Sequence, residues 1–134
     1  KDTGIENRVI EAIIKKTENF FLLDFEIPFL FNKDKEIKPF LSARYSKFEQ
    51  INNDSLILNY VDWLWVDSFE GLPMNKEDVF SLPNLKKCLV SPERWGKEKD
   101  IVKIATFMKS NNFNFDLIMT DLNTVEAWNA ALKT

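Results

Sequence analysis

The sequence predicts an α/β fold in which helices cover a parallel sheet. Five short apolar runs each end in a polar or charged side chain, and segments with helical periodicity lie between several of them. The ends of these runs are about 20 to 30 residues apart, which is the length of a βα unit. With 134 residues, of which 45% are hydrophobic, the chain is long enough to bury one core. We therefore expect residues 1–134 to form a single domain.

Continuous apolar runs predict strands here, because the strands of a parallel sheet are covered on both faces. Pro28 ends the first run, and tryptophan and valine enrich the third. The five predicted strands are residues 20–25, 40–45, 60–67, 85–90 and 115–120. The polar groups at their ends are Asp24, Arg44, Asp67, Ser91 with Glu93, and Asp121. Because α/β proteins place their chemistry at the carboxyl ends of strands, this rim is the predicted site.

Apolar residues at spacings of three and four predict helices on either side of these strands. Asn75 is expected to cap a short helix that has Glu77 and Asp78 in its first turn, where the helix dipole favours acids. Thr124 is expected to cap the last helix. The four predicted helices begin at residues 4, 75, 97 and 124. Strands alternating with helices or loops predict right-handed crossovers.

Two architectures accommodate such a parallel sheet. An open doubly wound sheet is complete at 134 residues. A (β/α)8 TIM barrel needs about 250 residues, so this chain would supply its carboxyl-terminal five βα units. Periodicity does not distinguish a five-stranded partial TIM barrel from the open sheet.

Charge and composition exclude several classes of protein. The 18 Lys and Arg residues are scattered among 21 Asp and Glu residues, giving a net charge of −3, which disfavours a nucleic-acid partner. No apolar stretch reaches the 18 or so residues that span a bilayer, and no signal peptide opens the chain. The single cysteine, Cys88, lies in an apolar run and is predicted to be buried. We expect no membrane span and a cytoplasmic, reducing location.

Two features of the whole chain bear on activity. It contains no histidine, so an acid–base mechanism that uses two histidines cannot be complete within it. It begins at Lys1 rather than at methionine and enters a helical pattern almost at once. We therefore interpret it as part of a longer protein.

Five segments at the predicted strand ends occur in a collinear order. They are FFLLDFEIPFL at 20–30, SARYSKFEQ at 42–50, WLWVDSF at 63–69, CLVSPE at 88–93 and IMTD at 118–121. In that order they resemble the carboxyl-terminal part of bacterial proteins in the glycerophosphodiester phosphodiesterase-like family, within the PI-PLC-like phosphodiesterase superfamily. Similar segments of relatives look like FDMSVP, R-x-SE-x-E, W-x-D-x-F, SPE and TD. The resemblance extends from Phe20 to Trp128.

This resemblance implies a TIM barrel whose first three strands lie upstream of Lys1. In the family those strands carry two catalytic histidines, the first in an HRG-type motif, and an E-x-D metal pair. It also implies metal-assisted cleavage of a glycerol- or polyol-type phosphodiester, with those histidines as general acid and base. Two positions depart from the pattern. Lys47 stands where relatives have Glu, and Glu26 stands where better-known members carry a lysine for phosphate.

Asp24 and Glu26 are the predicted metal ligands. Their side chains lie on the same side of a strand, and carboxylate oxygens are the ligands that Ca²⁺ and Mg²⁺ prefer. The resemblance places Asp24 at the position of a family metal ligand. The alternative interpretation is that Asp24 caps the next turn and Glu26 is solvated.

Arg44, Asp67 and Trp65 are the predicted substrate- and phosphate-binding residues. The guanidinium of Arg44 suits a phosphate, but it would equally serve as a latch to Glu49 or Asp67 that fixes the loop. The indoles of Trp63 and Trp65 share a strand face with Asp67, which suits a polyol, although strand tryptophans also pack as core residues.

Ser91, Glu93 and Asp121 complete the predicted rim. No histidine is available to activate Ser91, so a structural hydrogen bond is expected of it rather than nucleophilic attack. Asp121 is expected to start the turn into the last helix.

The leading functional hypothesis is the carboxyl-terminal portion of a metal-dependent phosphodiester hydrolase-like protein, inactive alone. Its partner would be a small-molecule phosphodiester. The outer strands FFLLDF and FDLIMT would also expose apolar surface and backbone groups, which favours self-association or pairing with an amino-terminal half of the barrel. The alternative is a noncatalytic α/β domain that binds a small ligand or another protein.

Overall fold

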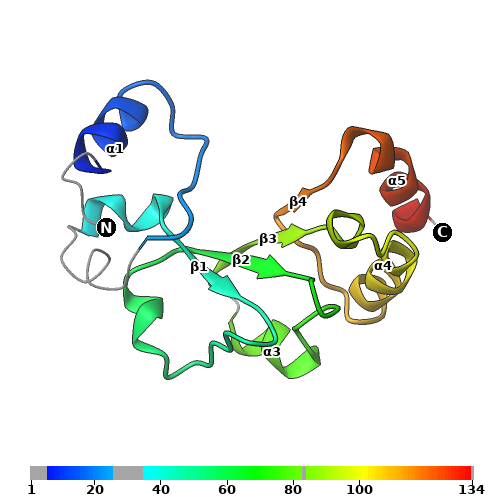
Figure 1. Cartoon of the computed structure of the whole chain (residues 1–134). Helices are drawn as coiled ribbons and strands as arrows, with labels where there is room; N and C mark the ends of the chain where they lie inside the picture. Colours follow the sequence, from blue (N-terminus) through cyan, green and yellow to red (C-terminus); the bar gives the residue numbers. More distant parts are fainter. Residues whose placement is uncertain (1–5, 26–34, 83, 134) are drawn as a thin grey trace.

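The computed structural model describes residues 6–25, 35–82 and 84–133. At its centre lies a sheet of four parallel strands, in which each strand neighbours the next along the chain (Figure 1). These are β1 (Ser42–Tyr45), β2 (Trp63–Asp67), β3 (Lys86–Val90) and β4 (Leu117–Met119). The prediction of an α/β fold with a parallel sheet is confirmed.

Helices and single helical turns connect the strands. The α-helices of the described residues are α1 (Glu6–Ile14), α3 (Lys76–Ser81), α4 (Asp100–Ser110) and α5 (Val125–Lys133). Short 3-10 turns are η1 (Lys35–Phe40), η2 (Leu56–Asn59), η3 (Pro92–Trp95) and η4 (Leu122–Thr124). None of these helices is both long and apolar enough to cross a membrane.

The first predicted strand, residues 20–25, is reduced to a single parallel bridge between Leu22 and Leu41. The amide of Leu22 donates to the carbonyl of Phe40 at 2.7 Å, and the amide of Ser42 donates to the carbonyl of Leu22 at 3.0 Å. Asp24 then takes a left-handed backbone conformation with φ of 63°, which a regular strand does not contain. The segment therefore occupies the position beside β1 without extending the ladder.

Strand register decides which side chains share each face of the sheet. Tyr45 pairs with Val66, which pairs with Leu89, and all three side chains are fully buried. They join one core cluster with apolar residues of α3, α4 and α5. The opposite face carries Arg44 beside Trp65, and this row is only partly covered.

The short helix α3 forms as its sequence predicts. The side chain of Asn75 accepts a hydrogen bond from the amide of Asp78, and the carboxylate of Asp78 accepts one from the amide of Asn75, which completes a capping box. The carboxyl end of α3 is satisfied by Lys87, whose ammonium donates to the carbonyls of Leu82 and Leu85. Burial lowers the pKa of Lys87.

The last helix starts differently from its prediction. The hydroxyl of Thr124 donates to the carbonyl of Asp121 and contacts Glu93, and it caps no described backbone amide. The prediction for Cys88 is confirmed, because its side chain is buried and burial raises its pKa to about 11.

Replacing Leu89 with alanine tests this core. Leu89 is a fully buried residue of β3, so Leu89→Ala should lower the free energy of unfolding by about 2–5 kcal/mol through lost contacts and a cavity. Leu122→Ala is the matched control, because Leu122 is 91% exposed and its loss should change stability by less than about 0.5 kcal/mol. Urea denaturation measures both. Equal effects of the two substitutions would contradict the assigned core.

Candidate functional site

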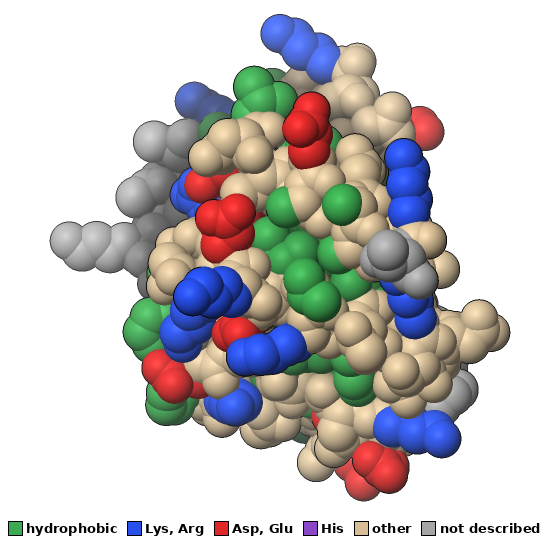
Figure 2. All heavy atoms as spheres, turned by 90° about the vertical axis from the view of Figure 1, so that its right-hand side faces the viewer, with side chains coloured by type: hydrophobic (Ala, Val, Ile, Leu, Met, Phe, Trp, Pro, Cys, Tyr) green, Lys and Arg blue, Asp and Glu red, His purple; other side chains and the backbone are tan. Residues whose placement is uncertain are grey.

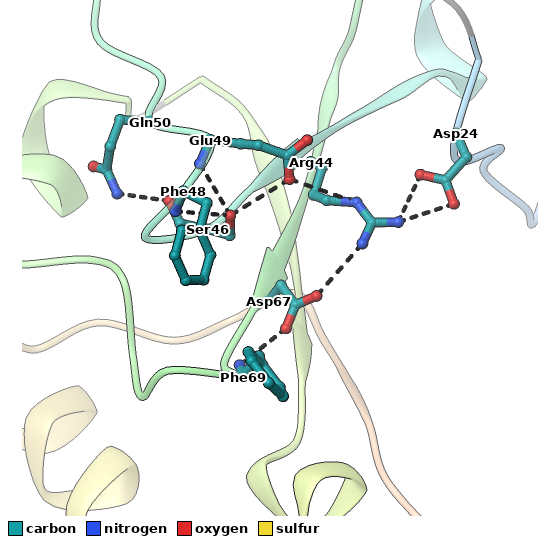
Figure 3. Close-up of polar contacts among 8 residues, drawn as sticks. All are labelled: Asp24, Arg44, Ser46, Phe48, Glu49, Gln50, Asp67 and Phe69. Atoms are coloured by element: carbon teal, nitrogen blue, oxygen red, sulfur yellow. Dashed lines mark hydrogen bonds and ion pairs between the residues drawn. The ribbon is translucent and has the colours of Figure 1, made fainter.

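One polar cluster at the carboxyl-end rim of the sheet is centred on Arg44. Its Nη2 atom donates to both carboxylate oxygens of Asp24, at 2.7 and 2.9 Å. Its Nη1 atom lies 3.6 Å from Asp67 Oδ2, and its Nε atom lies 3.7 Å from Glu49 Oε2. One guanidinium is thus shared by three carboxylates from three different segments (Figure 3).

Local hydrogen bonds hold two of these carboxylates in place. Glu49 ends a tight turn in which Ser46 Oγ accepts hydrogen bonds from the amides of Phe48 and Glu49, at 3.2 and 3.0 Å. Asp67 ends β2, and its Oδ1 atom accepts a hydrogen bond of 2.9 Å from the amide of Phe69. The arginine therefore lies among groups whose positions are set by their own segments.

Burial differs across this cluster. The Asp67 side chain is only 9% exposed, whereas those of Asp24 and Glu49 are 63% and 55% exposed. The hydrogen bond to Asp24, against the opposing effect of burial, raises the pKa of Arg44 above its ordinary value. Because an ionised carboxylate as buried as Asp67 needs a partner, Arg44 has a clear structural role as a latch.

The structure brings together three of the predicted site residues, Asp24, Arg44 and Asp67. Trp65 lies on the same sheet face, with its ring 6.0 Å from that of Phe21. Glu26 lies outside the described residues. Both oxygens of Asp24 are engaged by Arg44, and within the described ranges no three carboxylate, cysteine or histidine side chains are arranged to hold a metal ion.

A second cluster at the same rim is centred on Glu93. One of its carboxylate oxygens accepts hydrogen bonds from the hydroxyls of Thr120 and Thr124 and, at 3.1 Å, from the amide of Asp121. The other accepts from the hydroxyl of Ser91. Although burial opposes ionisation, these hydrogen bonds outweigh it and lower the pKa of Glu93 below its ordinary value.

This second cluster joins the ends of β3 and β4 to α5. Ser91 is fully buried, and its Oγ atom accepts a 2.7 Å hydrogen bond from the indole of Trp128 on α5. The prediction of a structural hydrogen bond for Ser91 is confirmed. Asp121, expected to start a turn, does so, and it also pairs with Arg94.

Sequence reasoning did not identify several rim residues. Thr120 and Thr124 give no signal as partners of Glu93, because they lie 27 and 31 positions from it. Phe69, Trp95 and Lys97 also meet at this rim although they come from the loops after two different strands. All three follow predicted strands, and Phe69 also ends the quoted segment WLWVDSF.

Comparisons with known proteins assign no family. No protein-family model, no curated protein and no solved structure matches the chain. The resemblance to glycerophosphodiester phosphodiesterase-like proteins therefore stays a prediction.

The latch role of Arg44 can be tested by removing its charge. Arg44→Gln leaves the buried carboxylate of Asp67 without its cation, so it should lower the free energy of unfolding at pH 7 by about 1–3 kcal/mol. Adding Asp67→Asn should restore part of that loss. Lys38→Gln breaks a partly exposed pair with Asp62 and should cost less than about 1 kcal/mol. Urea denaturation of the wild type and the three variants measures these free energies. A double variant that recovered none of the lost stability would contradict the latch.

The Glu93 cluster predicts a dependence of stability on pH. Because the folded protein lowers the pKa of Glu93, its stabilising effect is complete above the ordinary glutamate value of 4.5 and is lost as the pH falls through the lower folded-state value. Glu93→Gln should therefore be less stable than wild type near neutral pH, with a difference that shrinks on acidification. Glu98→Gln, at an exposed position, is the control. Denaturation of each protein between pH 3 and pH 7 measures the stability difference between wild type and Glu93→Gln. A difference that stayed constant over this range would contradict the prediction.

Proposed function

We propose that this chain is the carboxyl-terminal part of a (β/α)8 barrel protein that hydrolyses glycerol- or polyol-type phosphodiesters. Its own contribution is the wall and polar rim of the substrate site. The order of the parallel strands is the observation that carries this proposal.

Five successive segments neighbour one another in sequence order. The Leu22 segment bridges to β1 through Leu41, and β1, β2, β3 and β4 follow across the sheet. An uninterrupted order is typical of a barrel, in which every strand pairs with the next. A doubly wound sheet reverses its order at a switch point, and none occurs among these described segments.

The coverage of the sheet also supports a barrel. The fully buried row of Tyr45, Val66 and Leu89 packs with residues of the helices, as the outer face of a barrel does. The other face keeps large side chains partly exposed, including Leu117 at 48%. In a barrel this second face would be covered by the remaining strands, supplied by an amino-terminal half.

The chemistry of the chain fits a contributing rather than a complete catalytic unit. Polar groups stand at the ends of the strands, but the chain contains no histidine to act as general acid or base. The proposal therefore places proton transfer upstream and expects the 134-residue chain to be inactive alone.

The proposed divalent cation has one candidate ligand in the described residues, Asp24. Three carboxylates around a single guanidinium leave the Arg44 cluster negatively charged, which attracts a cation rather than a phosphate. For Asp24 to bind such an ion, its pair with Arg44 would have to open, and the other ligands would come from outside the described residues.

Turnover by two proteins tests the proposal. The 134-residue chain should not hydrolyse glycerophosphodiesters or a bis-aryl phosphate. A longer protein that joins it to upstream βα units should hydrolyse them, and a chelator should stop this turnover. In that longer protein Asp24→Asn should lower kcat/KM at least about tenfold. Asp121→Asn, another rim aspartate paired with an arginine, is the control.

Two outcomes would contradict the proposal. Metal-dependent turnover by the 134-residue chain would show that the catalytic half is wrongly assigned. An upstream sequence without an HRG-type strand and an E-x-D pair within about 120 residues, the length of three βα units, would instead favour a noncatalytic binding domain.

A further inference from the structure

Two lysines from different segments approach the same turn at the end of β2. Residues 68–71 form this turn, in which the amide of Gly71 donates to the carbonyl of Ser68 at 2.9 Å. The ammonium of Lys97 donates to the carbonyl of Phe69. The ammonium of Lys47 lies beside Gly71, where a Cβ atom would be 3.8 Å from it.

The turn between these lysines is held rigidly. Ser68 is fully buried, and its hydroxyl donates to the carbonyl of Val90 at 2.6 Å. The amide of Phe69 donates to Asp67, and Gly71 adopts φ of 88°, which L side chains rarely accept. Lys97 is itself fixed at its backbone, because its amide donates to the carbonyl of Pro92 at 3.0 Å.

The ammonium groups of the two lysines approach backbone atoms rather than carboxylates. In the part of the chain that the structure describes, neither Lys47 nor Lys97 forms an ion pair with a carboxylate. Glu70 lies in the same turn, but it is exposed and pairs with neither lysine. Two ammonium groups beside one turn can both donate hydrogen bonds to an anion that binds there. The Arg44 cluster offers no such site, because carboxylates already surround its guanidinium.

Exposed aromatic rings adjoin Lys97. Phe69 and Trp95 are 47% and 39% exposed, and their rings pack edge to face with centroids 5.1 Å apart. Lys97 Nζ lies 5.5 Å from the centroid of Phe69. Figure 2 views the molecule from the side toward which the strand arrows of Figure 1 point, and it shows apolar side chains in the middle of this face with acidic and basic side chains around them. Apolar walls with a few charged groups are typical of small-ligand sites.

We infer that Lys47 and Lys97 bind the phosphate of the substrate at the 68–71 turn, with its polyol carbons against Phe69 and Trp95. This inference rests on the proposed function and moves phosphate binding from Arg44 to the two lysines. The substrate is then a phosphodiester whose polyol group is large enough to reach the rings. The lysines act as binding residues, and no covalent step involves them.

Binding of glycerol 1-phosphate and of inorganic phosphate to the full 134-residue chain tests this inference. Calorimetric titration should show that Lys47→Gln and Lys97→Gln each weaken binding of glycerol 1-phosphate about tenfold, since a hydrogen bond to a charged group is lost. Two controls match these variants. Lys109→Gln removes a lysine that also donates to a backbone carbonyl, and Lys76→Gln removes an exposed lysine on α3. Both controls should bind as wild type does.

The aromatic contribution is measured in the same titrations. Phe69→Leu and Trp95→Leu should weaken the binding of glycerol 1-phosphate more than the binding of inorganic phosphate. Only glycerol 1-phosphate has carbons that can contact the rings. Phe113→Leu is the control, because Phe113 forms a similar edge-to-face pair with Phe115 just before β4. Unfolding curves of each variant show whether the fold is kept.

Amide chemical shifts locate the bound anion independently of any substitution. Titration with inorganic phosphate should move the resonances of Lys47, Phe69, Gly71 and Lys97. Shifts confined to Arg44 and its neighbours, or glycerol 1-phosphate binding unchanged in both lysine variants, would overturn the lysine site and leave the proposed function standing. Inorganic phosphate bound at the lysines with no preference for glycerol 1-phosphate would keep the anion site and remove the polyol assignment. If neither glycerol 1-phosphate nor inorganic phosphate bound to the chain, both the anion site and the polyol assignment would be overturned.

Discussion

The in-register parallel pairing of β1, β2 and β3 is the constraint on which the other features depend. It sets Arg44 beside Trp65 and Tyr45 beside Val66, so one face is packed with apolar groups and the other carries polar and aromatic ones. A slip of one residue would exchange the faces, burying the charge of Arg44 and exposing the core. The same pairing brings the carboxyl ends of the strands to one rim, where the Arg44 and Glu93 clusters lie.

The rim is divided by charge into regions that suit different ligands. Around Arg44, three carboxylates outnumber the guanidinium, and the buried Asp67 makes that pairing necessary for stability. Around the 68–71 turn, two lysines approach backbone rather than carboxylates. Between β3 and β4, the negative charge of Glu93 is stabilised by hydroxyls and an amide instead of by a cation. A phosphodiester carries one negative charge, so the position that we propose for it on this rim depends on these local fields rather than on the net charge of −3.

Much of the fold could be predicted from the sequence, because it depends on local patterns. Apolar runs located β1 to β4, and the Asn75–Asp78 capping box located α3. The segment at residues 20–25 has the same apolar pattern, but its pairing ends where Asp24 turns the backbone. Thr124 has the composition of a cap, yet its hydroxyl is taken by Glu93, which lies 31 positions away. A local sequence pattern shows which element a segment is able to form. It does not show the contacts with distant residues that compete with that element.

The candidate site was predictable only in part, and the reason is physical. The sequence by itself determined that polar groups follow the strands and that no histidine is present, because composition and βα spacing are properties of the chain. Only the tertiary structure decided that Arg44 is shared by Asp24, Glu49 and Asp67 and that Lys47 and Lys97 meet at one turn. Electrostatic interaction depends on separation in space, and the pairing of strands brings together charges that lie tens of residues apart in the chain.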